Sequence, residues 1–132
     1  MNSTATVHTI SAVFITFSGN CRQAFTAYHA CFGGELHIES FEHHFEGFSA
    51  KPVVRAVLRS SKLVIQGSDL VHSEGRRIGN YMAVFVYCAS EQERQHYLEQ
   101  LCVEANHRES FNTGEALVEI VDRFDVRWVF AV

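Results

Sequence analysis

The alternation of apolar and polar positions divides the chain into two stretches that repeat one order of expected elements. Residues 12–17 form an apolar, strand-like run that precedes a polar turn and a helical pattern, and residues 83–87 begin the same order again. Both runs open with Ala-Val-Phe, and the second begins 71 positions after the first. Tyr28 and Tyr97 hold matching helix positions, 69 apart. A spacing shared by several elements predicts a duplicated structural unit.

One helix is expected in each stretch. The first covers residues 21–31, with Ser18 or Asn20 at its start and Gly33-Gly34 at its end. The second begins with Ser90-Glu91-Gln92-Glu93, a capping box in which a hydroxyl and a carboxylate each satisfy a free backbone N–H. Apolar residues three and four positions apart predict one buried side on each helix. They are Ala24, Phe25, Tyr28 and Cys31 or Phe32 in the first helix, and Tyr97, Leu98, Leu101 and Cys102 in the second.

Alternation with a period of two predicts the remaining strands. They lie at residues 36–41, 53–59, 63–66, 116–121 and 126–132. Each half then has the order strand, helix, strands. This order predicts the α+β class, with mostly antiparallel sheets and the helices on one side.

The composition narrows the possible functions. The chain has 132 residues, of which 47% are hydrophobic and 20% charged, with a net charge of −4, as in one globular domain. Basic residues are scattered and Arg76-Arg77 is expected in a solvated loop, so no nucleic-acid partner is expected. No membrane association is expected either, because no apolar run reaches the ~20 residues that span a bilayer. The four cysteines lack CxxC spacing and no signal-peptide pattern opens the chain, which favours buried free thiols and a cytoplasmic location.

Several motifs resemble a known family. The run Phe17-Ser18-Gly19-Asn20-Cys21-Arg22-Gln23-Ala24-Phe25, then Tyr28, then Cys31-Phe32-Gly33-Gly34-Glu35-Leu36, is similar to the opening of PhnB-like proteins. These proteins are a branch of the glyoxalase/bleomycin-resistance/dioxygenase (vicinal oxygen chelate) superfamily. Two further matches follow in the expected order, Gln66-Gly67-Ser68-Asp69 and Asp122-Arg123-Phe124-Asp125-Val126-Arg127-Trp128.

The resemblance implies a single domain of residues 1–132 built from two βαβββ modules, the first in residues 9–70 and the second in 78–132. Each module would curl into half of a U-shaped sheet around a cavity, with the helices outside. It also implies a homodimer, because relatives commonly are homodimers with pockets near the subunit interface. The chain departs from the branch at residues 115–121, which replace an aromatic, Gly-rich segment that normally lines the cavity. A different ligand, or none, is therefore expected.

The superfamily's metalloenzymes hold a cation with His and Glu side chains on four strands. The resemblance places the equivalent positions near Val13 or Phe14, near Gln66, near Tyr81 or Met82, and near Val129. None of these is His, Asp, Glu or Cys, so neither a metal nor another cofactor is expected. The remaining metal candidates are His43, His44 and Glu46, and adjacent histidines on a strand point to opposite faces.

Other residues are candidates for binding a small molecule. Polar lining is expected from Gln66 and Tyr81, positive charge from Arg55, Arg59 or Arg127, and an apolar wall from Phe14, Phe17 and Trp128. An anionic or amphiphilic molecule would suit such a pocket, although the arginines would instead face solvent if the cavity is filled. No catalytic residue is expected, because no Gly-x-Ser-x-Gly frame occurs. Cys88, before a helix, is either a packed turn residue or a reactive thiol.

Three functions are compatible with the resemblance and these residues. The first is a metal-free, small-molecule-binding member of the superfamily, similar to the bleomycin-resistance type. The second is a lyase-, isomerase- or dioxygenase-type enzyme that recruits metal through His43, His44 or Glu46. The third is a dimeric interaction module whose cavity is filled by its own aromatic side chains.

Overall fold

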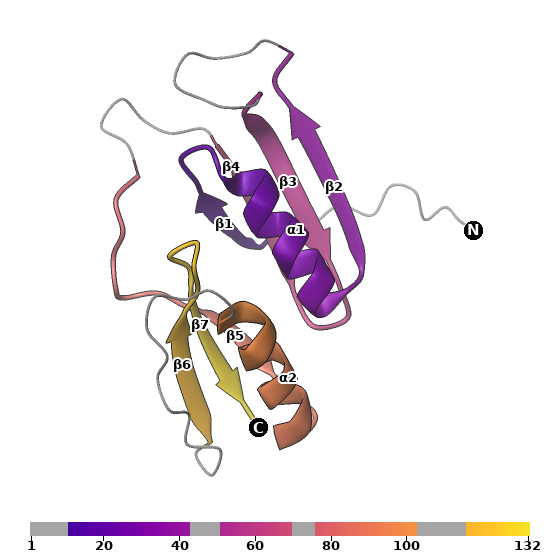
Figure 1. The fold of residues 1–132 in the computed structure, drawn as a ribbon, viewed down its shortest axis with the longest axis vertical. Coiled ribbons are helices and arrows are strands. Elements are labelled where there is room, and N and C mark those ends of the chain that lie inside the picture. Colours follow the sequence, from indigo (N-terminus) through magenta and orange to yellow (C-terminus); the bar gives the residue numbers. More distant parts are fainter. Residues whose placement is uncertain (1–10, 43–50, 70–75, 103–115) are drawn as a thin grey trace, which may run out of the picture.

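The computed structural model describes residues 11–42, 51–69, 76–102 and 116–132, which form two units that follow each other along the chain (Figure 1). The first unit contains β1 (Val13–Thr16), α1 (Cys21–Phe32), β2 (Glu35–Ser40), β3 (Val53–Arg59) and β4 (Val64–Ser68). The second contains β5 (Val84–Tyr87), α2 (Glu91–Cys102), β6 (Leu117–Val121) and β7 (Arg127–Ala131). Every predicted helix and strand is present, so the duplicated order of elements is confirmed.

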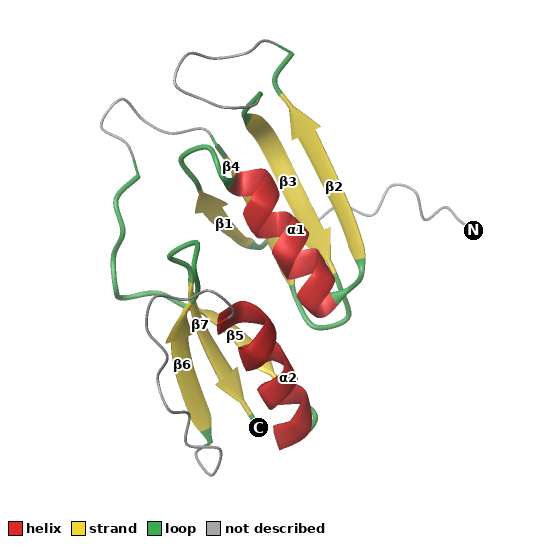
Figure 2. Ribbon diagram, viewed as in Figure 1, coloured by secondary structure: helices red, strands yellow, loops and turns green. Residues whose placement is uncertain are grey.

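The strands form two mixed sheets, one in each unit (Figure 2). The first has the order β1-β4-β3-β2 and the second β5-β7-β6. β1 pairs in parallel with β4, and β5 in parallel with β7, whereas the other pairings are antiparallel. β5, β7 and β6 thus take the places of β1, β4 and β3. The chain between α2 and β6 lies mostly outside the described residues, so the described second module is βαββ.

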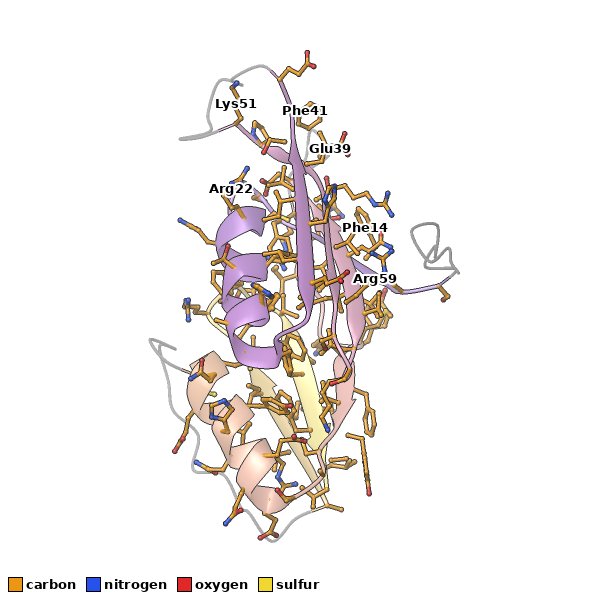
Figure 3. All side chains as sticks on the ribbon, turned by 90° about the vertical axis from the view of Figure 1, so that its right-hand side faces the viewer. Phe14, Arg22, Glu39, Phe41, Lys51 and Arg59 are labelled. Atoms are coloured by element: carbon orange, nitrogen blue, oxygen red, sulfur yellow. The ribbon has the colours of Figure 1, made fainter. Side chains whose placement is uncertain are left out.

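Both helices cover the same side of the sheets, as predicted (Figure 3). Strand residues alternate accordingly: Trp128 and Phe130 on β7 are fully buried, whereas Val129 between them is partly exposed. On β5, Val86 is buried while Phe85 is 58% exposed. Each sheet therefore has a helix-covered face and an open face, and the open faces are available to line a cavity or an interface.

The two units share one aromatic core between their helices and β7. The Phe32 ring of α1 stacks on Trp128 with 5.4 Å between centroids, and it lies 4.8 Å from the Tyr97 ring of α2. Tyr28 meets Trp128 edge to face at 5.2 Å. Aromatic pairs at such distances stabilise by about 0.5–1.5 kcal/mol each beyond the area they bury. The packing fixes the relative position of the two modules.

The helix starts are held in different ways. At α2 the expected capping box is present: Glu93 N–H donates to Ser90 Oγ at 3.1 Å, and Ala89 N–H donates to Glu93 Oε1 at 2.8 Å. At α1 Asn20 makes no side-chain cap. Instead, the buried Asp69 carboxylate accepts from Gly19 N–H at 2.8 Å and Cys21 N–H at 3.1 Å. The start of α1 is therefore capped by Asp69, which lies 48 positions after Cys21, and not by Ser18 or Asn20, the two residues that the sequence suggested.

The four cysteines are free and buried, as expected. Cys88 follows β5 and precedes α2. Burial, with the Glu93 carboxylate as a second cause, raises the pKa of the Cys88 thiol, so the structure favours a packed turn residue over a reactive thiol. No helix among the described residues is long and apolar enough to cross a membrane.

Candidate functional site

A cavity of about 420 Å³ lies between the two modules. Its walls are β1, residues 76–79 and 82–84 that lead into β5, and residues 125–127 at the start of β7. β1 is the edge strand of the first sheet, and all four of its residues line the cavity. The volume falls in the range of roughly 300–1,000 Å³ typical of small-molecule sites.

Arginine side chains supply most of the charge on the cavity wall. Arg76 donates from Nη1 to the Phe124 carbonyl oxygen at 2.8 Å, and its guanidinium carbon lies 4.9 Å from the centre of the Phe17 ring. Arg127 forms an ion pair with Glu119, with 2.9 Å between Nη1 and Oε2. The Arg127 Nε atom is buried and has no hydrogen-bond partner among the described residues. A buried N–H group without an acceptor lowers the free energy of unfolding, because it has lost its hydrogen bonds to water.

The buried Asp122 carboxylate shapes the turn that forms one wall of the cavity. Its Oδ1 accepts from Phe124 N–H at 2.8 Å and Val126 N–H at 3.0 Å. Its Oδ2 accepts from the Tyr28 hydroxyl at 2.7 Å and from Trp128 Nε1 at 2.8 Å. Burial raises the pKa of Asp122, and these four hydrogen bonds oppose that rise. The carboxylate thereby ties the turn, which contains Asp125 in the left-handed region (φ 65°), to α1 of the other module.

The sequence did not identify Asp122 or Arg76 as site residues. Asp122 belongs to one of the motifs that resemble the family, but the motif alone predicts no function for it. Arg76 was expected in a solvated loop, and the structure corrects this because the side chain is only partly exposed and lines the cavity. Its environment comes from Phe124, 48 positions away, which no local signal indicates.

Two of the eight candidate ligand residues, Phe14 and Arg127, line this cavity. Gln66 pairs with Phe14 in the β1–β4 register and accepts a hydrogen bond from Arg55 Nε at 3.1 Å. Figure 3 places Phe14 and Arg59 on the side of the sheets away from both helices.

The other candidates lie elsewhere. Phe17 and Trp128 are fully buried in the helix-covered core, and neither is among the residues lining the cavity. Their expected place on its wall is therefore corrected: both follow the alternation that points them towards the helices. Tyr81 is 86% exposed and is not a lining residue either, whereas its neighbour Met82 is. Contact of Gln66, Arg55 and Arg59 with a ligand stays a prediction.

The strand registers show which residues of the two modules correspond. Phe14 pairs with Gln66 in the first sheet, and the corresponding pair in the second sheet is Phe85 with Val129. Phe85 follows Phe14 by the 71-residue repeat. None of these four side chains carries a carboxylate, thiolate or imidazole group that could bind a divalent cation. The position that the resemblance implies near Tyr81 or Met82 stays a prediction.

No cluster of three His, Cys, Asp or Glu side chains suited to a metal ion occurs within the part of the chain that the structure describes. His43, His44 and Glu46 lie outside that part. A site at these three residues therefore stays an untested prediction.

Comparisons with known proteins identify similar folds. No family model matches the chain, and no curated protein matches it in sequence. Protein PA1353 from Pseudomonas aeruginosa matches in structure with a TM-score of 0.71 at 23% identity, over 93% of this chain and 97% of that one. The PhnB protein from Bacillus cereus matches with a TM-score of 0.67 at 18% identity, over 93% and 98%. The product of At5g48480 from Arabidopsis thaliana gives 0.53 at 16% identity, over 96% and 100%.

These similarities extend over nearly the full length of each protein, so they concern both modules and their arrangement. The chain therefore has the PhnB-like, glyoxalase/bleomycin-resistance type of fold that its motifs predicted. At such low identity the similarity establishes only the fold. The ligand and the chemistry have to be inferred from the residues of the site.

Proposed function

We propose that this chain is a metal-free small-molecule-binding protein of the PhnB-like branch of the glyoxalase/bleomycin-resistance superfamily. The observation that carries the proposal is the cavity of about 420 Å³ between the modules. It combines apolar side chains such as Phe14, Ile78 and Met82 with the polar groups of Arg76 and Arg127. Concave sites with an apolar lining and a few convergent polar groups are typical of small-molecule binding.

The absence of metal in this proposal rests on residue types. The parallel strand pairs of the two sheets, β1–β4 and β5–β7, contain the matching pairs Phe14–Gln66 and Phe85–Val129. Divalent transition metals in proteins are held by imidazole, thiolate or carboxylate groups. One amide oxygen among four such positions is insufficient, so binding rather than metal-assisted catalysis is the function that these residues support.

Binding of N-phenyl-1-naphthylamine, a neutral apolar dye that fluoresces in apolar surroundings, tests this proposal. Phe14→Asn removes an aromatic wall of the cavity, and Phe85→Asn is a matched control. The two residues are repeat equivalents that are 55% and 58% exposed, and only Phe14 lines the cavity. We expect saturable binding that weakens about tenfold in Phe14→Asn and changes little in Phe85→Asn. No saturable binding, or equal effects of both changes, would contradict a ligand site at this cavity.

We also propose a homodimer formed through the open face of β5, β7 and β6, with a second copy as the occupant. Tyr87, Ala131 and Leu117 lie in one row across these strands, and Phe85 pairs with Val129 beside them. Tyr87 and Leu117 are 64% and 55% exposed. The charges on this face, Glu119 and Arg127, pair with each other, so two copies can meet without repulsion there. An exposed apolar face of this kind is typical of an interface.

A further inference from the structure

We propose that the cavity binds the carboxylate of a monoanionic amphiphile, with Arg76 and Arg127 holding the carboxylate. The inference rests on the proposed binding function and specifies the chemical class of its ligand. It follows from the charge of the cavity wall, from the donors that the two guanidinium groups present, and from the apolar side chains opposite them.

The charge of the wall is opposite to that of the whole protein. Three arginines, Arg76, Arg77 and Arg127, are among the described residues that line the cavity, and Asp125 is the one acidic residue among them. Glu119 lies beside the site through its ion pair with Arg127. Basic residues thus outnumber acidic ones in the cavity lining of a chain whose net charge is −4. Such a lining favours an anion over a cation.

Two of the guanidinium groups are already oriented by the protein. Arg76 is fixed by the Phe124 carbonyl oxygen on one side and by the Phe17 ring on another. A guanidinium has five N–H donors, so this single hydrogen bond leaves others for a ligand. Arg127 is fixed by Glu119 through Nη1, and one such pairing leaves further N–H donors of the guanidinium for a ligand. Planar donors of this kind match the two oxygens of a carboxylate.

The rest of the wall requires an apolar portion of the ligand. Phe14 on β1 is 55% exposed, and Ile78 and Met82 on the segment leading to β5 are 55% and 62% exposed. All three line the cavity. A free inorganic anion would leave this surface in water, whereas a chain attached to the carboxylate would cover it. A medium-chain carboxylate therefore satisfies both parts of the site.

Competition against bound N-phenyl-1-naphthylamine tests the inference with three probes: octanoate, its neutral isostere octanamide, and acetate. We expect octanoate to compete at least roughly tenfold more strongly than octanamide, because hydrogen bonds to a charged group are the stronger ones. Acetate, which lacks the chain, should compete weakly. The preference for octanoate should decrease as salt is added.

Variants that replace one arginine with neutral glutamine show which arginine is responsible for the preference for octanoate. Arg127→Gln and Arg76→Gln should each remove most of the preference for octanoate while octanamide competes as before. Arg22→Gln is the matched control, because Arg22 lies on α1 on the opposite side of the sheets and bonds to Ser40 (Figure 3). If a Gln variant does not fold, Arg76→Lys keeps the charge but loses the planar fork, and it should weaken octanoate binding alone.

The outcomes separate the two proposals. Equal competition by octanoate and octanamide in the wild type, or an equal loss in Arg22→Gln, would overturn the carboxylate site and leave the binding function intact. Failure of the dye and all three probes to bind would overturn the binding function itself.

Discussion

The Tyr28 hydroxyl on α1 donates a 2.7 Å hydrogen bond to Asp122 Oδ2 in the last hairpin, which links the two modules through a buried carboxylate. Trp128 Nε1 donates to the same oxygen at 2.8 Å. The other oxygen, Oδ1, holds the turn that lines the cavity. One carboxylate thus bonds both to α1 and to the turn that lines the cavity.

Replacing Tyr28 with Phe removes that link and leaves the packing nearly unchanged. We expect the free energy of unfolding to fall by about 1–2 kcal/mol, because a buried acceptor then loses one of its donors. Denaturant unfolding followed by circular dichroism measures the change. Tyr81→Phe, at a residue that is 86% exposed, is the control and should change stability by less than about 0.5 kcal/mol. Equal stability of the two variants would show that the bond contributes little.

The buried thiols should be inert in the native protein. Burial, assisted for Cys21 by the Asp69 carboxylate, raises the pKa of Cys21 and Cys31 from 9.0 to about 12. Three pKa units correspond to about a thousandfold less thiolate at pH 8, and the thiolate is the reactive form. Alkylation by iodoacetamide, followed by mass spectrometry, should therefore be slow until the chain is unfolded in guanidinium. Rapid labelling of Cys21 or Cys31 in the native protein would contradict this expectation.

The same shifts predict how stability depends on alkaline pH. The folded-state pKa of Cys21 and Cys31 lies above the unfolded value, so the folded protein keeps its protons longer. Their contribution to stability is complete below pH 9 and is lost as the pH rises towards about 12. Urea unfolding of the wild type and of Cys21→Ala measures this loss. The variant should lose less stability than the wild type between pH 8 and pH 10.

Divalent metals should not stabilise the protein through a specific site. An ion that binds only the folded state stabilises it by about 2.7 kcal/mol at a hundredfold excess over Kd, a shift of several degrees in Tm. We expect no such shift on adding Zn²⁺, Ni²⁺, Mn²⁺ or Fe²⁺. A saturable rise in Tm that disappears in His43→Ala, His44→Ala or Glu46→Ala would contradict the metal-free proposal and favour an enzyme.

The proposed dimer can be tested by its mass in solution. Light scattering should give about twice the 14.9 kDa of one chain. Leu117→Lys places a charge in the apolar row of β6 and should give the mass of one chain. Gln92→Lys makes the same change on the exposed surface of α2 and should leave the dimer intact. A wild-type monomer at micromolar concentration would exclude this interface.

The sequence by itself determined the secondary structure, the duplication and the buried faces. These features follow from local patterns: a period of two puts Trp128 and Phe130 on one face of β7, and spacings of three and four put Tyr97 and Leu101 on one side of α2. The capping box at Ser90 is local as well. Such signals lie within one element, so they can be recognised without knowledge of the fold.

Only the tertiary structure decided which side chains share the cavity and what holds them. Arg76 meets Phe124, Tyr28 meets Asp122, and Asp69 caps α1, across 48, 94 and 48 positions of the chain respectively. Phe17 and Trp128 are buried in the core because the helices cover the face of the sheet to which these side chains point. Contacts at such separations depend on how the two modules pack, and a local pattern carries no information about that packing.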